Sequence, residues 1–167
     1  PEVTGRVCPA GCEKGCVLNK QHEPVTIREN EAAIVERAYN EGYVHARPPK
    51  HRTGKKVAVI GSGPAGLACA NQLNQKGHSV TVFEKNEAVG GLLRLGIPDF
   101  KLNKSVIDRR LALLKEEGIE FKTGIKVGVD IKAQELLDGY DAACVAIGSE
   151  VPRDLKVEGR DLDGVHL

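Results

Sequence analysis

From residue 56 onward, the chain contains short apolar runs separated by a segment whose apolar residues have helical spacing. KVAVI (residues 56–60) is a β-branched run typical of a buried parallel strand, and PAGLACANQLNQKG (residues 64–77) has the apolar spacing of a helix. SVTVFE (residues 79–84) is a second strand-like run. A strand, a helix and a strand within about 30 residues predict a βαβ unit, and therefore an α/β fold with a parallel sheet.

The pattern continues beyond residue 100. Ile107, Leu111 and Leu114 mark one face of a helix over residues 104–117, which ends at Gly118. The following segments predict two short strands, a short helix and a buried strand, at residues 119–123, 125–129, 131–138 and 140–148 respectively. The last residues show no period, which indicates an exit segment.

The first 45 residues have a different texture. Residues 1–23 are rich in Cys, Gly and Lys with little periodicity, which predicts a loop ordered by bound metal or by packing on a neighbour. Thr26 and Glu29 have capping-box spacing and predict a helix that stops at Gly42. The stretch HARPPKHRTGKK (residues 45–56) is basic with two adjacent prolines, so we interpret it as a solvated linker and the domain boundary.

Composition narrows the class of protein. Of 167 residues, 41% are hydrophobic and 28% are charged, which is typical of a soluble globular chain. A net charge of +1 and an aromatic content of 4% argue against nucleic-acid binding. The longest apolar run, residues 142–147, is far short of the roughly 20 residues of a membrane span, and no cationic leader precedes an apolar stretch. We therefore expect no membrane association and a cytoplasmic location.

The start of the chain suggests a piece of a longer protein. The first residue is Pro1 and the sequence contains no Met. We therefore expect the function to be shared with sequence outside these residues.

Glycine is over-represented, with 19 residues where average usage predicts roughly 12. Gly61, Gly63 and Gly66 form a G-x-G-x-x-G turn between the first predicted strand and the helix. In this position the three glycines allow a tight turn, a close approach of pyrophosphate to the backbone, and helix–strand packing. Glu84 ends the second strand, where a carboxylate can accept hydrogen bonds from a ribose diol. The set predicts dinucleotide binding, and the alternative is a glycine-rich turn of another α/β domain.

The type of dinucleotide follows from two further features. Glu84 disfavours a 2′-phosphate by charge repulsion, which argues against NADP at this turn. Gly90 and Gly91 add a second close-approach point, an arrangement that resembles FAD enzymes of the glutathione-reductase-like class. The alternative is a plain turn before a helix.

The five cysteines fall into two groups. Cys69 and Cys144 lie alone in apolar segments and are interpreted as small buried hydrophobic residues. Cys8, Cys12 and Cys16 follow one another at intervals of four residues, which is the density of a metal-ligand set. Their spacing leaves three possibilities open: iron–sulfur ligation, a zinc site completed by His22, and free or redox-active thiols.

Three stretches together carry a resemblance to a known family. They are TGRVCPAGCEKGCVL, RPPKHRTGKKVAVIGSGPAGLACA and GHSVTVFEKNEAVGGLLRLGIPDFKLNKSVIDRR. The chain resembles, over nearly its whole length, the small (β) subunit of NAD(P)H-dependent glutamate synthases, and it is related to the N-terminal region of dihydropyrimidine dehydrogenase.

The resemblance implies the fold class and the domain order. The fold would be α/β, a Rossmann-like FAD-binding domain with a parallel sheet, preceded by a small helical cysteine-rich (iron–sulfur) segment. The expected divisions are the C-terminal part of a helical [4Fe–4S] domain, a linker, the FAD domain and an exit segment toward an NAD(P)H-binding domain, at residues 1–45, 46–56, 57–150 and 151–167.

The resemblance also implies the site residues. Cys8 and Cys12 would serve one cluster, with Glu31 as a fourth ligand, and Cys16 the other. The family cysteines that precede this stretch are absent, so neither cluster would be complete. Gly11 replaces a family proline without changing the ligand spacing. Lys101 would offer a cation to the pyrophosphate, and the other FAD contacts would be Gly61, Gly63, Ala65, Gly66, Glu84, Lys85, Gly91 and Leu92, with Val7 and Val127 through the backbone.

The function implied by the resemblance is electron transfer. NADPH would give a hydride to FAD, and single electrons would pass through [4Fe–4S] clusters to a large (α) subunit that makes glutamate. We identify no acid–base catalyst in the sequence. The alternatives are an NAD-dependent dehydrogenase fragment with a zinc loop, and a non-catalytic assembly module with a Rossmann scaffold.

Overall fold

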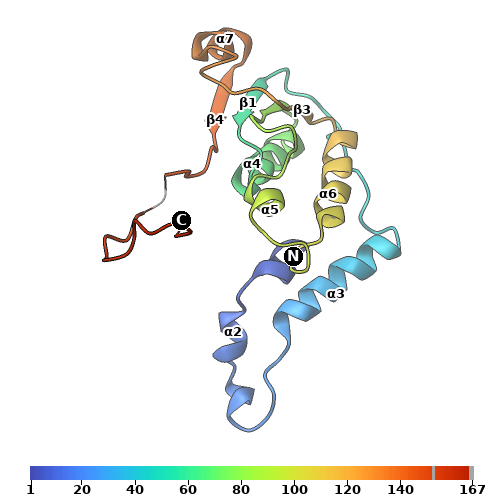
Figure 1. The fold of residues 1–167 in the computed structure, drawn as a ribbon. Helices are drawn as coiled ribbons and strands as arrows, with labels where there is room; N and C mark the ends of the chain where they lie inside the picture. Colours follow the sequence, from blue (N-terminus) through green and yellow to red (C-terminus); the bar gives the residue numbers. More distant parts are fainter. Residues whose placement is uncertain (152, 166–167) are drawn as a thin grey trace.

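A parallel four-stranded sheet forms the centre of the molecule (Figure 1). The computed structural model describes residues 1–151 and 153–165. Neighbouring strands are parallel and lie in the order β3-β2-β1-β4. The predicted α/β fold with a parallel sheet is therefore confirmed. The strands are β1 (Lys56–Ile60), β2 (Ser79–Phe83), β3 (Glu120–Lys122) and β4 (Ala142–Val145).

Four helices follow β1 in the chain and surround the sheet: α4 (Pro64–Gln75), α5 (Leu92–Leu95), α6 (Lys104–Glu116) and α7 (Ala133–Gly139). Helix α6 shows why the sequence folds this way. Its buried face carries Ile107, Leu111 and Leu114. These residues join one valine of β1 and both valines of β2, Val59, Val80 and Val82, in the main core cluster. The side chain of Asn103 caps its N-terminus by accepting a hydrogen bond from the Ser105 amide at 2.9 Å, and Gly118 ends it at φ +95°.

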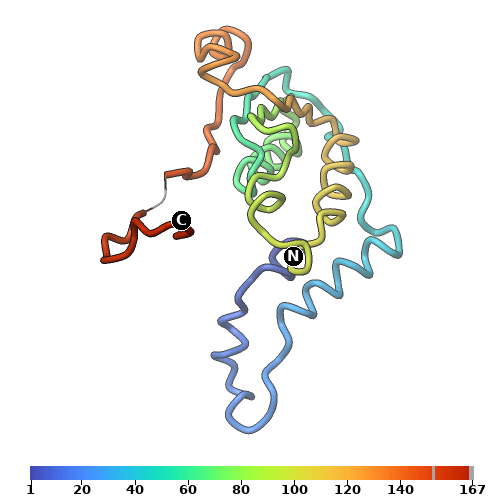
Figure 2. The backbone as a smooth tube through the Cα atoms, in the orientation of Figure 1, coloured from blue at the N-terminus to red at the C-terminus, as the bar shows by residue number. Residues whose placement is uncertain are grey.

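The cysteine segment, as we name residues 1–45, lies at one end of the sheet domain, residues 56–150 (Figures 1 and 2). Val3 and Val7 of this segment pack against the main core cluster of the sheet domain. The prediction of a loop over residues 1–23 was wrong, because local backbone hydrogen bonds close three short helical turns. The segment contains α1 (Thr4–Val7), α2 (Gly11–Lys14), the 3-10 helix η1 (Val17–Lys20) and α3 (Ile27–Asn40).

The predicted helix after residue 26 is present, but its capping box is not. The Thr26 side chain makes no capping hydrogen bond to α3. Instead, the Glu13 carboxylate accepts a hydrogen bond from the Arg28 amide at 2.9 Å. A residue from α2 thus satisfies one of the free amides of the first turn, a solution that local spacing cannot reveal.

Two strand predictions also need correction. Residues 125–129 form no strand, and only an isolated bridge joins Val127 to Ile131. Strand β4 was predicted to be buried, yet it lies at the edge of the sheet, where it pairs with β1 alone among the described strands. Val145 and Ile147 are therefore 66% and 64% exposed. An apolar run predicts a strand, but it does not tell whether both sides of that strand are covered.

The linker between the two parts is anchored more firmly than predicted. Arg52 donates hydrogen bonds to the Asn74 side chain at 2.7 Å and to the carbonyls of His78 and Glu117 at 2.8 and 3.0 Å. The Arg47 amide donates to the Glu117 carboxylate at 3.0 Å. The basic stretch is therefore fastened to the sheet domain, and it is not simply a solvated connector.

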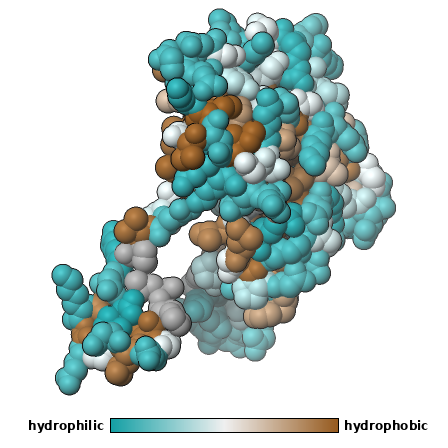
Figure 3. All heavy atoms as spheres, turned by 45° about the horizontal axis from the view of Figure 1, so that its top comes forward, coloured by the Kyte–Doolittle hydropathy of each residue, from teal (hydrophilic) through white to brown (hydrophobic). Residues whose placement is uncertain are grey.

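Beyond β4 the chain runs away from the sheet (Figures 1 and 2). The exit segment prediction also includes Pro152, His166 and Leu167, which lie outside the described residues. Figure 3 shows apolar side chains in separate patches among larger hydrophilic areas on one face. Within residues 1–151 and 153–165, we find no helix with the length and apolar character needed to cross a membrane.

Candidate functional site

The glycine-rich turn after β1 has a geometry that only glycine permits at two positions. Gly61 has φ +102°, and a Cβ atom there would lie 2.4 Å from the Ala146 carbonyl oxygen. A Cβ atom on Gly66 would lie 2.0 Å from the Gly61 carbonyl oxygen. Both distances are far inside van der Waals contact, so these two glycines close the turn on itself and on the chain after β4.

Gly63 differs from its neighbours because it faces open space. Its backbone is extended, at φ −65° and ψ 179°, and a Cβ atom there would have no neighbour within 4 Å. Gly63 is also the N-cap of α4, Pro64 follows in the first turn, and no side chain caps this helix end. The first amides of α4 and the positive end of its dipole are therefore available to an anion. This arrangement fits the diphosphate of a dinucleotide.

Glu84 lies directly after β2 and accepts hydrogen bonds from the glycine-rich turn. One carboxylate oxygen accepts hydrogen bonds from the Ser62 amide at 3.0 Å and from the Ser62 hydroxyl, and the other accepts two from Asn86 at 2.9 and 2.8 Å. Burial opposes ionisation, but these hydrogen bonds hold the pKa of Glu84 below its usual value. Glu84 is 4% exposed. The residue predicted to bind a ribose therefore serves here as a hydrogen-bond acceptor for groups of the protein itself.

Ser62 is a residue that the motif analysis overlooked, because G-x-G-x-x-G leaves this position free. It is fully buried, and its hydroxyl accepts a hydrogen bond from the Gly90 amide at 3.1 Å. Gly91 has φ +52°, and a Cβ atom there would lie 2.8 Å from the Gly63 Cα atom. The glycine-rich turn and the Gly90–Gly91 pair therefore meet in space, although 24 or more residues separate them in the chain.

The remaining predicted contacts lie around this centre. Lys85 pairs with Glu150, and Leu92 is 71% exposed at the start of α5. Ala65 is exposed in the first turn of α4. Val127 packs against a small second core cluster formed by Ala58, Phe83 and Leu136. Their assignment to FAD stays a prediction.

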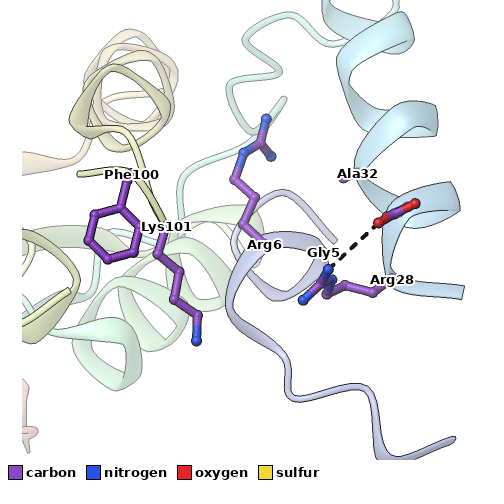
Figure 4. Close-up of a pocket in the computed structure, with 7 residues that line it drawn as sticks. Gly5, Arg6, Arg28, Ala32, Phe100 and Lys101 are labelled. Carbon is purple, nitrogen blue, oxygen red and sulfur yellow. Dashed lines mark ion pairs between the residues drawn. The ribbon is translucent and has the colours of Figure 1, made fainter. Parts of the chain in front are cut away.

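Lys101 lies in a cavity of about 400 Å³ where the cysteine segment meets the sheet domain (Figure 4). Arg6, Arg28 and Phe100 line the same cavity, and Arg28 pairs with Glu29. None of the residues of the glycine-rich turn lines it. Lys101 thus lies where the cysteine segment contacts the sheet domain, a contact region that we call the seam. Its predicted contact with a pyrophosphate stays a prediction.

Of the three clustered cysteines, Cys8 is the C-cap of α1, Cys12 lies within α2 and Cys16 is the N-cap of η1. Cys12 is exposed, and Cys8 and Cys16 are half-buried. The nearby backbone groups of Val25 and Leu18 lower the pKa of the Cys16 thiol, which favours the thiolate that a metal requires. Within residues 1–151 and 153–165, no three His, Cys, Asp or Glu side chains converge on one metal position. The segment thus supplies thiolate ligands and not a closed site.

Cys69 and Cys144 differ from these three. Both pack against the main core cluster, as the sequence predicts, but they are half-buried and not fully buried. Burial and the neighbouring Cys144 raise the pKa of Cys69 to about 11. These thiols are therefore packing groups.

Comparison with known proteins agrees with this geometry. A family model described as pyridine nucleotide-disulphide oxidoreductase matches residues 55–167, more than half of the chain. The chain belongs to the pyridine nucleotide-disulphide oxidoreductase family. A second model, described as dihydropyrimidine dehydrogenase domain II with a 4Fe-4S cluster, matches residues 1–43. The predicted cofactors, FAD and a [4Fe–4S] cluster, agree with these two models.

The relatives of this chain confirm the resemblance predicted from the sequence. The chain is 52% identical over 166 residues to the glutamate synthase [NADPH] small chain of Mycobacterium tuberculosis, an alignment that covers 99% of this chain and 34% of the relative. It is 53% identical to the Bacillus subtilis small chain, with the same coverage. The chain therefore spans about a third of the length of these relatives.

A solved structure is similar in fold. FprA from Mycobacterium tuberculosis, in its His57Gln mutant form, aligns with a TM-score of 0.59 at 28% identity, over 71% of this chain and 27% of that one. The Rossmann-like fold is therefore shared with this solved structure.

Proposed function

We propose that this chain is the flavin-binding and cluster-binding part of an NAD(P)H-dependent oxidoreductase of the glutamate synthase type. The observation that carries this proposal is the identity of 52% to a glutamate synthase small chain along 99% of the chain, which includes both motifs. The two family models support the same order, a cluster domain followed by a nucleotide-binding domain.

The residues of the turn would hold FAD by its diphosphate. Gly63 leaves room for the phosphates, and the uncapped amides of α4 donate hydrogen bonds to them. Glu84 keeps Ser62 and Gly90 in place, so the two glycine turns form one preorganised surface. FAD, when bound, exchanges a hydride with the nicotinamide and single electrons with the clusters. The role we propose for this polypeptide is to orient the cofactor.

The cysteines would supply thiolate ligands to [4Fe–4S] clusters. Thiolates suit iron–sulfur clusters, and the hydrogen bond from the Ala10 amide to the Cys8 sulfur at 3.4 Å is of the kind that tunes such ligands. Because three cysteines cannot complete two four-iron clusters, the remaining ligands would come from other parts of the protein. Glu31, exposed on α3, stays a predicted ligand.

The partner would be the glutamate-forming large subunit or an equivalent domain. The relatives include separate small chains and much longer proteins. The chain covers 34% of the Mycobacterium tuberculosis small chain but only 8% of the Schizosaccharomyces pombe protein named glutamate synthase [NADH], at 51% identity. The same module is thus used in a separate small chain and in a much longer one. We place the protein in the cytoplasm, where thiolate ligands stay reduced.

The visible spectrum and metal content of the purified full-length protein test the proposal. Flavin bands together with a broad iron–sulfur absorption and bound iron are expected. Bound zinc without a chromophore would instead support the dehydrogenase fragment with a zinc loop. A colourless, metal-free full-length protein would support the assembly module and contradict the proposal.

A further inference from the structure

A buried carboxylate lies almost at the beginning of the cysteine segment. The Glu2 side chain is 4% exposed, and it accepts hydrogen bonds from the Arg109 Nε atom at 2.6 Å, the Arg110 Nε atom at 2.8 Å and the Tyr39 hydroxyl at 3.2 Å. Burying a carboxylate is costly unless it is paired and hydrogen-bonded. Two of its three donors belong to α6, so this residue is held by the sheet domain.

Arg109 extends the same network to a second carboxylate. Its Nη1 atom donates to Glu36 of α3 at 2.9 Å, and its Nη2 atom donates to the other oxygen of that carboxylate. The guanidinium also lies over the Tyr39 ring, with its central carbon 3.9 Å from the ring centroid. One arginine of the sheet domain therefore contacts three side chains of the cysteine segment. The planar fork of arginine suits this double pairing, which a lysine cannot reproduce.

The network leads directly to the first cysteine. Arg6 donates to the Glu36 carboxylate and, at 2.7 Å, to the Glu2 carbonyl oxygen. Arg6 belongs to α1, and Cys8 is the C-cap residue of that helix. A continuous set of side-chain contacts thus runs from Arg109 of α6 through Glu36 to Arg6 of α1, the helix that ends at Cys8.

We infer that Arg109 is a positioning residue that holds the cluster-bearing turn at a fixed distance from the flavin. The inference rests on the proposed function. Each transfer would oxidise the reduced flavin by one electron and reduce one cluster by one electron, the electrons having come from the nicotinamide hydride. Because the rate of such a transfer falls steeply with distance, a small displacement of the Cys8 turn slows this step, whereas hydride transfer reaches the flavin from the nicotinamide without passing through that turn.

The first experiment measures the position of the segment without any cofactor chemistry. Arg109→Gln is compared with Arg37→Gln, whose arginine, among the described residues, pairs with Glu41 at the exposed end of α3. Amide hydrogen exchange of the full-length protein is expected to accelerate at least about tenfold in α1 and α3 of Arg109→Gln, with α4 unchanged. Arg37→Gln should match the wild type. Unchanged exchange in α1 and α3 of Arg109→Gln would overturn the inference.

The second experiment follows the two reduction steps separately. The full-length protein with its flavin and clusters is mixed with NADPH without oxygen, and flavin bleaching and the electron paramagnetic resonance signal of the reduced clusters are timed. Arg109→Gln is expected to slow cluster reduction at least about tenfold with flavin reduction unchanged. Wild-type rates for both steps, or equal slowing of both, would overturn the inference.

A milder variant covers the case in which Arg109→Gln does not fold. Glu36→Gln removes the shared charge while leaving Glu2 paired, and Glu36 is 37% exposed on its side chain. Glu36→Gln must show the same selective slowing of cluster reduction. Cluster reduction at the wild-type rate in this variant would overturn the inference. Absence of flavin reduction in the wild-type protein would instead contradict the proposed function.

Discussion

The glycine-rich turn and the cysteine segment carry equally recognisable motifs, yet the structure treats them differently. The turn is closed within the chain: Gly61, Gly66 and Gly91 touch backbone at distances that admit no side chain. The three clustered cysteines are exposed or half-buried and converge on no common point within the described residues. A site built from backbone conformation is complete once the local chain folds, whereas a site built from side-chain ligands waits for the ligands that other segments supply.

The largest expected effect comes from filling the closed part of the turn. Gly66→Ala would place a methyl group 2.0 Å from the Gly61 carbonyl oxygen, so we expect the free energy of unfolding to fall by about 3 kcal/mol. Gly11→Ala in α2, where a Cβ atom meets nothing within 4 Å, should change it by less than about 1 kcal/mol. Chemical denaturation measures both values. Equal stability of the two variants would remove the contrast between the turn and the cysteine segment.

The next largest effect concerns the carboxylate that supports the turn. Glu84→Ala leaves the buried donors of Ser62 without an acceptor, and we expect a loss of about 2 kcal/mol. The nearby Glu87 is exposed, so Glu87→Ala should be neutral within about 0.5 kcal/mol. Thermal unfolding of the two variants provides the comparison. A neutral Glu84→Ala variant would show that the turn does not depend on this network.

Thiol reactivity separates the two groups of cysteines. At pH 8 in the cluster-free chain, the exposed Cys12 should react with an alkylating reagent at least about tenfold faster than Cys69, because burial raises the pKa of Cys69 to about 11. Mass spectrometry of peptides after timed labelling gives the two rates. Equal rates would mean that the sheet domain does not protect its thiols.

The smallest expected effect is acid sensitivity at the seam. The hydrogen bond from Arg109, together with Arg6, lowers the pKa of Glu36 from 4.5 to about 2. Since the folded value is depressed, the stabilisation is present above pH 4.5 and is lost as the pH falls toward 2. After allowance for solvent screening of this partly exposed group, it amounts to about 1 kcal/mol.

Glu36→Gln should therefore lower the free energy of unfolding by that amount at pH 7 and flatten its decline between pH 4.5 and 2. Glu41→Gln, which removes an exposed surface pair, should leave both unchanged. Denaturation curves at several pH values measure the difference. An undiminished acid dependence in Glu36→Gln would exclude Glu36 as its source.

The difference between the two regions also explains what the sequence could predict. The βαβ unit, with its order of strand, turn and helix, can be predicted from local apolar spacing and from glycines, which adopt backbone conformations that other residues rarely adopt. Ser62 was overlooked because its role depends on Glu84 and Gly90, which are distant in the chain. The cap of α3 by Glu13 was not predicted for the same reason, because Glu13 precedes that helix by more than ten residues.

Burial of β4 and the anchoring of the linker were mispredicted for a related physical reason. An apolar run specifies that a strand forms, but the number of its neighbours depends on the whole sheet, and Val145 shows how exposed an edge strand remains. Likewise, the positive charge of Arg52 is equally compatible with solvent and with three protein acceptors.

The bound flavin of full-length Gly63→Ala tests the central claim most directly. A Cβ atom on Gly63 meets no protein atom within 4 Å and its φ is −65°, so the variant should fold normally while the methyl group occupies the space of the diphosphate. Gly139→Ala, at the end of α7 and equally open, is the matched control. We expect about one flavin per chain in the control and at least about tenfold less in Gly63→Ala. A folded Gly63→Ala protein with full flavin content would contradict the account.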